Sequence, residues 1–181
     1  MRSSRTPPDA DDVRRQADVC SGVGRAHKQA IAVAAAAARL IRPGTAIALS
    51  AGTTTWALSP YLADIDGLTI VTNSTTVADT IADLPGSSRR TVILTGGVRT
   101  PSAALVGPIA DIGIRAIHVD QLFLGVHGMA AHAGYTSPNL AEAQTNKELI
   151  SRASQVGAPS ASPTSAYHRT RSHTCGRPSG S

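Results

Sequence analysis

Apolar and polar positions alternate along the middle of the chain in a way that predicts short buried strands separated by helices. Short apolar runs rich in Ile, Val, Leu and Thr indicate strands, and longer segments with apolar residues at helical spacing indicate helices. Such strands are predicted at residues 45–50, 68–72, 91–95 and 119–126, and helices at 26–41, 55–65, 74–84, 108–117 and 139–156. Strands alternating with helices predict an α/β fold, with a Rossmann-like, mostly parallel sheet covered on both faces.

The two ends of the chain lack this pattern. Residues 1–24 mix Pro, Ser, Arg and Asp with scattered apolar residues, and residues 157–181 contain no Leu, Ile, Val, Met, Phe or Trp. A segment so poor in apolar side chains cannot bury enough surface to offset the entropy of ordering it. We therefore expect an irregular N-terminal segment over 1–24, an α/β domain over 25–156 and a disordered Ser/Pro/Arg tail over 157–181.

Composition and charge exclude several classes of protein. The chain has 181 residues and a net charge of +5, but residues 29–156 carry eight basic and eight acidic side chains. The excess positive charge therefore lies in the ends and indicates no basic face on the domain.

No apolar run is long enough for a membrane span, and the N-terminus does not resemble a signal peptide, which favours a cytoplasmic protein. The two cysteines, Cys20 and Cys175, form no disulfide framework, and with the neighbouring histidines they match no zinc pattern. We expect no metal and no cofactor.

Candidate chemistry follows the predicted strands. Ligands of open α/β sheets bind beyond the carboxyl ends of the strands. There, glycine lets backbone amides approach a ligand closely, hydroxyl groups donate hydrogen bonds to it, and helix N-termini favour negative charge. A helix cap or a plain turn explains any one of these segments, so it is the repetition that indicates a site for a phosphate or a polyhydroxylated ligand. The small and hydrogen-bonding residues at the four strand ends are Gly52, Thr53, Thr54 and Thr55, then Thr72, Asn73 and Ser74, then Thr95, Gly96 and Gly97, and finally Gly125 through Gly128.

Six stretches, taken in order, resemble the effector-binding domain of DeoR-type bacterial transcriptional regulators. They are IALSAGTTTWAL, LTIVTNS, VILTGGVR, ALVGPIA, VDQLFLGVHGM and GYTSPNLAEAQTNKELI, and they span roughly residues 25–156. The resemblance implies the fold shared by ribose-5-phosphate isomerase, glucosamine-6-phosphate deaminase and the CoA transferases. It also implies that the domain is the effector-sensing part of a repressor of carbohydrate metabolism. Such a domain binds a phosphorylated sugar or a related metabolite, forms a homo-oligomer and has no catalytic residue.

The resemblance further assigns the ligand-binding positions. It places the phosphate at Gly52, Thr53, Thr54 and Thr55, the pocket walls at Thr72, Asn73, Gly96 and Gly97, and the sugar at Asp120, Gly125, Gly128, Glu142 and Lys147. Two of these residues keep a structural alternative, because Asp120 is also explained as a strand cap and Lys147 as a solvated helix residue.

The chain departs from the family pattern at both ends. The residues before Arg25 are too few and too irregular for a winged helix-turn-helix, so we expect DNA binding only through a helix-turn-helix that this chain does not contain. After the last helix, SRASQV leads directly into the tail where the family has an apolar strand and an Asp/Ser/Lys loop. We therefore expect a truncated chain, with a change of reading frame near Val156 as a hypothesis that sequencing of the gene region tests.

Two other interpretations of the chain remain open beside the sensor. The same fold hosts sugar-phosphate isomerases and deaminases, which need a general base and a proton shuttle. The available groups are Asp120, His127, Glu142 and Lys147, but no local cluster of acid and base is visible, so a sensor is favoured over an enzyme. A chain that does not fold stably is the third possibility.

Overall fold

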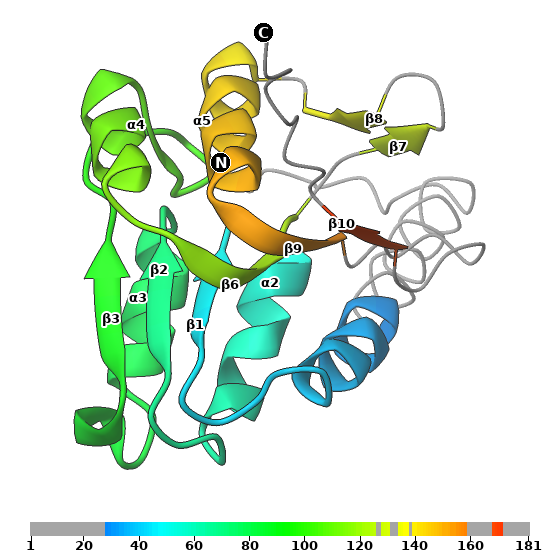
Figure 1. Ribbon diagram of the computed structural model, residues 1–181, viewed down its shortest axis with the longest axis vertical. Helices are drawn as coiled ribbons and strands as arrows, with labels where there is room; N and C mark the ends of the chain where they lie inside the picture. The colour runs from blue at the N-terminus through cyan, green and yellow to red at the C-terminus, as the bar shows by residue number, and fades with distance from the viewer. Residues whose placement is uncertain (1–27, 126–127, 131–133, 138, 159–167, 172–181) are drawn as a thin grey trace, which may run out of the picture.

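A six-stranded sheet forms the centre of the molecule, as seen in a computed structural model that describes residues 28–125, 128–130, 134–137, 139–158 and 168–171 (Figure 1). The strand order is β10-β9-β6-β1-β2-β3, and every neighbouring pair is parallel except β10 with β9. The strands are β1 (Ala46–Leu49), β2 (Thr69–Thr72), β3 (Thr91–Leu94), β6 (Val119–Phe123), β9 (Ala153–Ala158) and β10 (His168–Arg171). The predicted α/β fold with a mostly parallel sheet is confirmed.

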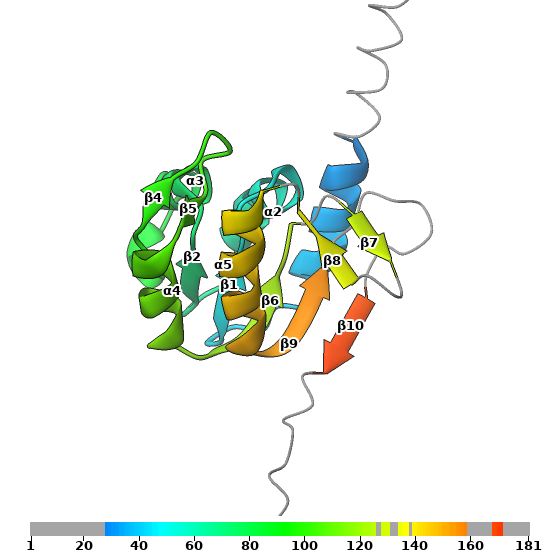
Figure 2. The same cartoon turned by 90° about the horizontal axis from the view of Figure 1, so that it is seen from above.

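Helices cover both faces of the sheet (Figures 1 and 2). Successive residues of a strand point to opposite faces, so β1 divides its side chains between two cores. Ile47 and Leu49 pack with buried residues of the helix over 28–38, of α2 (Thr53–Leu58) and of α3 (Thr75–Ala82). Ala48 packs with Ile114 of α4 (Pro108–Arg115) and Leu149 of α5 (Leu140–Ser151). The sheet therefore has the two-sided cover that its apolar strands require.

The predicted last helix is wrong beyond Ser151. Helix α5 ends there, and β9 begins at Ala153 and runs parallel to β6, with Ala153 paired to Val119. Ala153 and Val156 are both buried against the core between the sheet and α5, so these apolar residues stabilise the sheet instead of extending the helix. The expectation that SRASQV leads into the tail without a strand is therefore also wrong.

Part of the predicted tail has regular structure. Gly157 and Ala158 complete β9, and His168–Arg171 forms β10, which pairs with β9 in antiparallel register. The rest of 159–181 and all of 1–27 lie outside the described residues. Among the described residues, no helix combines the length and the apolar character needed to cross a bilayer.

Short elements complete the carboxyl edge of the sheet. Two hairpin-like pairs follow β3 and β6 in the chain, and neither was predicted. An isolated bridge between Ser74 and Ala104 joins the segment after β2 to the loop within the first pair. The helix predicted over 55–65 begins earlier, as α2, and continues as a 3-10 turn that contains Pro60. These elements are β4 (Val98–Arg99) with β5 (Leu105–Val106), β7 (Gly128–Ala130) with β8 (Gly134–Thr136), and the 3-10 helices η1 (Ser59–Leu62) and η2 (Ser87–Arg89).

Candidate functional site

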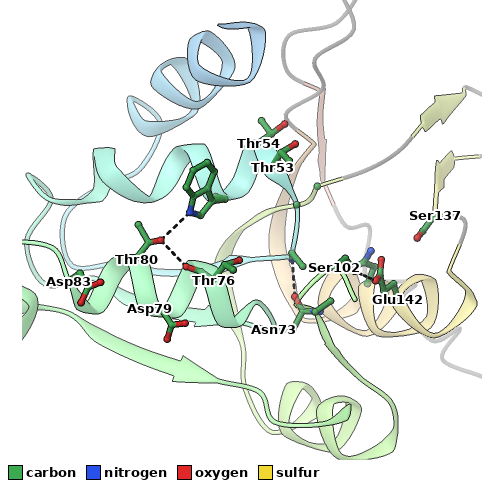
Figure 3. A pocket seen from close by; sticks show the side chains of 16 residues that line it. Thr53, Thr54, Asn73, Thr76, Asp79, Thr80, Asp83, Ser102, Ser137 and Glu142 are labelled. Carbon is green, nitrogen blue, oxygen red and sulfur yellow. Dashed lines mark hydrogen bonds between the residues drawn. The ribbon is translucent and has the colours of Figure 1, made fainter. Parts of the chain in front are cut away.

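A cavity of about 850 Å³ opens at the carboxyl ends of β1, β2 and β6. Its walls come from the turn after β1, from α2 and α3, from the loop between β4 and β5, and from the start of α5 (Figure 3). Loops and helix starts meet at this edge because all five parallel strands end there. The lining residues are Ala51, Gly52, Thr53, Thr54, Trp56, Asn73, Thr76, Asp79, Thr80, Asp83, Ser102, Ala104, Gly125, Ser137, Glu142 and Asn146.

The floor of the cavity depends on close contact between two strand ends. Gly125, after β6, packs directly on the turn after β1, since a Cβ atom at Gly125 would lie 2.8 Å from the carbonyl oxygen of Ala51 and 3.3 Å from the Cα atom of Gly52. The Gly125 N–H donates to Ser50 Oγ at 2.8 Å, and Ser50 is fully buried. A side chain at position 125 would separate the two ends, so the glycine is needed to shape the floor.

Asn73 links this floor to the start of β5 by hydrogen bonds. It is buried, its Oδ1 accepts a hydrogen bond from the Ala51 N–H at 3.0 Å, and its Nδ2 donates to the Leu105 carbonyl at 3.2 Å. Thr72 lies beneath it and does not line the cavity, because its hydroxyl donates to the Leu49 carbonyl at 2.7 Å and accepts from the Ser74 N–H. Both residues therefore hold the turn after β1 in place.

The N-terminus of α2 provides hydrogen-bond donors to the cavity. Ser74 and Asn139 cap α3 and α5 with their side chains, whereas α2 begins at Gly52 with no side-chain cap. The first N–H groups of a helix have no partner within the helix, so those of α2 are open to a ligand. Thr53 and Thr54 line the cavity beside them (Figure 3), while the Thr55 hydroxyl donates to the Gly52 carbonyl of its own helix at 2.9 Å.

Glu142 lies across the cavity from α2. Its Oε1 accepts a hydrogen bond from Thr100 Oγ1 at 3.0 Å and another from the Ser102 hydroxyl, so the loop between β4 and β5 fixes its position. Asn139 accepts hydrogen bonds from the N–H groups of Ala141 and Glu142 and thereby fixes the first turn of α5. Glu142 is thus a positioned hydrogen-bond acceptor.

An aromatic and acidic wall extends the cavity between α2 and α3. The Trp56 Nε1 donates to Thr80 Oγ1 at 3.0 Å, and the Thr80 hydroxyl donates to the Thr76 carbonyl at 2.8 Å (Figure 3). Asp79 and Asp83, one turn apart on α3, lie on the same wall. Among the lining residues that the structure describes, the charged side chains are carboxylates only, so negative charge in a ligand is favoured only near the N–H groups of α2.

The structure brings six of the predicted residues to the cavity and places six others elsewhere. The six are Gly52, Thr53, Thr54, Asn73, Gly125 and Glu142. Six do not line it, and these are Thr55, Thr72, Gly96, Gly97, Asp120 and Lys147. Gly128 is the first residue of β7. His127 lies outside the described residues.

Three of the residues that do not line the cavity have clear structural roles or positions. Asp120 lies at the opposite end of the sheet, where its Oδ2 accepts a hydrogen bond from the Ala46 N–H at 2.9 Å. Gly97 has φ 116°, and a Cβ atom there would lie 2.6 Å from the Val106 carbonyl oxygen, so its glycine serves the packing of β4 on β5. Lys147 is exposed on α5.

Sequence reasoning missed the α3 wall and two polar residues near Glu142. Thr76, Asp79, Thr80 and Asp83 recur at helical spacing, which is a readable signal for one polar face of α3. Ser102 and Asn146 carry no comparable pattern, because a loop hydroxyl and a single helix amide are common on any surface.

Comparison with known proteins gives one family and several relatives. The family model described as the DeoR C-terminal sensor domain matches residues 25–158. The uncharacterised HTH-type transcriptional regulator YulB of Bacillus subtilis (strain 168) is 34% identical over 126 residues, which are 69% of this chain and 47% of that protein. The HTH-type transcriptional regulator GolR of Listeria innocua serovar 6a is also 34% identical, over 69% of this chain and 48% of that protein. The chain spans about half the length of the curated relatives that it matches.

A solved structure with a similar fold is a D-ribose-5-phosphate isomerase in complex with phospho-erythronic acid. The TM-score is 0.50 at 13% sequence identity, over 71% of this chain and 49% of that one. At such low identity the likeness shows a shared fold and no more.

Proposed function

We propose that this chain, which belongs to the DeoR C-terminal sensor domain family, binds a phosphorylated sugar or a related metabolite as the sensing part of a transcriptional regulator. The observation that carries this proposal is the cavity at the carboxyl edge of the sheet, which opens on an α2 N-terminus without a side-chain cap. We propose that the whole regulator binds DNA through a helix-turn-helix, as the names of its relatives indicate for those proteins.

The polar groups of the cavity suggest how such a ligand binds. A phosphate beside Gly52 accepts hydrogen bonds from the first N–H groups of α2 and from the hydroxyls of Thr53 and Thr54. Ionised carboxylates only accept hydrogen bonds, so Glu142 and the two aspartates of α3 suit the hydroxyl groups of a sugar. The same carboxylates repel a second anionic group, so we propose a ligand with one phosphate.

Sensing without turnover is the proposed mode. The relatives are transcriptional regulators, and the likeness to an isomerase extends to the fold alone. Glu142 is held by two hydroxyl groups of the loop between β4 and β5, which suits a fixed acceptor for a ligand hydroxyl. A bound sugar phosphate would therefore remain chemically unchanged.

A thermal-shift panel tests this function. The purified chain is melted with sugar monophosphates, the same sugars without phosphate, sugar bisphosphates and inorganic phosphate. At a concentration near 100 times its Kd, a ligand stabilises the fold by about 2.7 kcal/mol, which raises Tm by roughly 5–15 °C. We expect this rise with a monophosphate and a smaller rise with the unphosphorylated sugar. Failure of every monophosphate to raise Tm above the matching sugar contradicts the proposal.

Two further measurements sharpen the panel. Thr53→Val removes one hydroxyl donor to a charged phosphate, worth about 1.5–3 kcal/mol, and should weaken binding roughly 10- to 100-fold. Thr91→Val is the matched control, because Thr91 is exposed on β3 and does not line the cavity. NMR spectra of the ligand after incubation should show no isomerised or deaminated product. Such a product would favour the enzyme.

A further inference from the structure

The cavity continues past the start of α2 into a groove between α2 and α3 (Figure 3). From Thr76 to Asp83 this groove follows α3 for about 10 Å along the helix axis. The whole cavity measures about 850 Å³, near the upper end of the roughly 300–1,000 Å³ that holds drug-sized ligands. A monosaccharide with one phosphate is smaller than most such ligands, so it would leave part of the cavity unfilled. The residues that line the α2–α3 groove are Trp56, Thr76, Asp79, Thr80 and Asp83.

Trp56 gives the α2–α3 groove a fixed apolar surface. Its side chain lines the cavity, and the residue is 45% exposed. The Nε1 group donates to Thr80 Oγ1 at 3.0 Å, and the Thr80 hydroxyl donates in turn to the Thr76 carbonyl at 2.8 Å. The single polar group of the indole is thereby satisfied, so the ring offers apolar surface to a ligand. Such a surface suits the C–H face of a sugar ring.

Asp79 and Asp83 are placed against the stability of their own helix. They lie four residues apart, and like charges at this spacing destabilise a helix. Asp83 is also the C-cap of α3, where the helix dipole disfavours negative charge. In the described part of the chain, neither aspartate takes part in an ion pair. Charges that oppose local stability in this way are typical of functional sites.

We propose that the α2–α3 groove is a second sugar subsite, so that the ligand is a disaccharide with one phosphate. This inference rests on the proposed function and adds a second ring to the phosphorylated one. The first ring would lie between the start of α2 and Glu142. The second ring would pack its C–H face on Trp56. Its hydroxyl groups would donate hydrogen bonds to Asp79 and Asp83, since carboxylates only accept them.

Calorimetric titration of the full chain tests the second subsite. Glucose 6-phosphate is compared with maltose 6′-phosphate and cellobiose 6′-phosphate, and galactose 6-phosphate with lactose 6′-phosphate. Each disaccharide keeps the phosphorylated ring of its monosaccharide and adds a ring without phosphate. At least one disaccharide phosphate should bind at least about tenfold tighter than its monosaccharide phosphate, because the second ring fills the groove. Glucosamine 6-phosphate is included as a ligand that adds a positive charge and no ring.

Variants of the groove separate binding from folding. Trp56→Ala should weaken the disaccharide phosphate at least about tenfold and the monosaccharide phosphate less than about threefold. Tyr61→Ala is the matched control, since Tyr61 is 37% exposed on η1, does not line the cavity and should leave both affinities unchanged.

Asp79→Ala provides a second readout that a purely structural role would not give. The loss of a charged acceptor should weaken the disaccharide phosphate roughly 10- to 100-fold. The Tm without ligand should stay the same or rise, because alanine favours a helix and the change removes the like-charge pair with Asp83. A residue that only supports the fold would lower Tm when replaced.

Four results would overturn the second subsite while the proposed function stands. They are equal affinities for every disaccharide phosphate and its monosaccharide phosphate, equal weakening of both ligands by Trp56→Ala, unchanged affinity in Asp79→Ala, and glucosamine 6-phosphate binding as tightly as the best disaccharide phosphate. The last result would show that the groove takes a cation. If no sugar phosphate binds at all, both proposals fail.

Discussion

Replacing Asn73 with alanine tests how the cavity floor is held. Asn73 is 1% exposed and joins two segments that follow different strands, since it accepts from the Ala51 N–H and donates to the Leu105 carbonyl. Alanine removes both hydrogen bonds and leaves a backbone donor and a backbone acceptor without these partners. The change should therefore lower the free energy of unfolding as well as disturb the turn after β1.

The magnitude follows from the cost of unpaired buried groups. Each one costs about 1–3 kcal/mol, and water that enters from the adjacent cavity lowers the total, so we expect a loss of about 2–5 kcal/mol. A loss of that size lowers Tm by roughly 10 °C.

Urea denaturation measures this loss directly. The midpoint should fall while the dependence on urea concentration stays the same, because the surface exposed on unfolding is unchanged. Asn146→Ala is the control, since Asn146 lines the same cavity from the half-exposed side of α5, and alanine favours a helix. A loss of under about 0.5 kcal/mol at Asn73, or equal losses at both positions, would refute the structural role of Asn73.

Three other predictions concern separate parts of the molecule. Gly97→Ala should destabilise the fold by about 2–4 kcal/mol in a thermal melt, because φ is 116° and the added Cβ meets the Val106 carbonyl; an unchanged Tm would contradict this. The hydrogen bond and charge of Arg115 hold the pKa of Glu148 below its ordinary value, so the ion pair stabilises the fold above the unfolded pKa and this stabilisation is lost as pH falls through the folded pKa. Glu148→Gln should thus lower Tm at neutral pH and not in strong acid, and a difference independent of pH would disprove the mechanism. Trp56 is the single tryptophan and lines the cavity, so a bound sugar phosphate should change the emission of the protein; constant emission at saturation would count against this site.

The sequence predicted the layered fold well because its strands are short apolar runs followed by small polar residues. β1 and β2 begin within a residue of their predicted starts, and both end at the turns that line the cavity. β9 was missed because Ser154 and Gln155 interrupt its apolar residues, so only the partner strand β6 makes it recognisable as a strand. Pairing between distant segments is not visible in a local pattern.

The candidate site was predicted in part, for a related reason. The turn at Gly52 and the amide of Asn73 follow two strand ends, and both line the cavity because those strand ends share one edge of the sheet. Asp120 follows the start of β6 and therefore lies at the other edge. Which face of a helix borders the cavity also depends on packing, so the difference between Asn146 and Lys147 on α5 could not be predicted.

An NMR titration of the labelled chain, with the sugar monophosphate that raises Tm most, shows where the ligand binds. We expect it in the cavity, with its phosphate at the start of α2. The largest shifts should be those of the amides of Gly52, Thr53 and Thr54, while Asp120 and Lys147 stay unchanged. Largest shifts at Asp120 or Lys147, or no saturable shift at the start of α2, would show that the phosphate does not bind at this helix start.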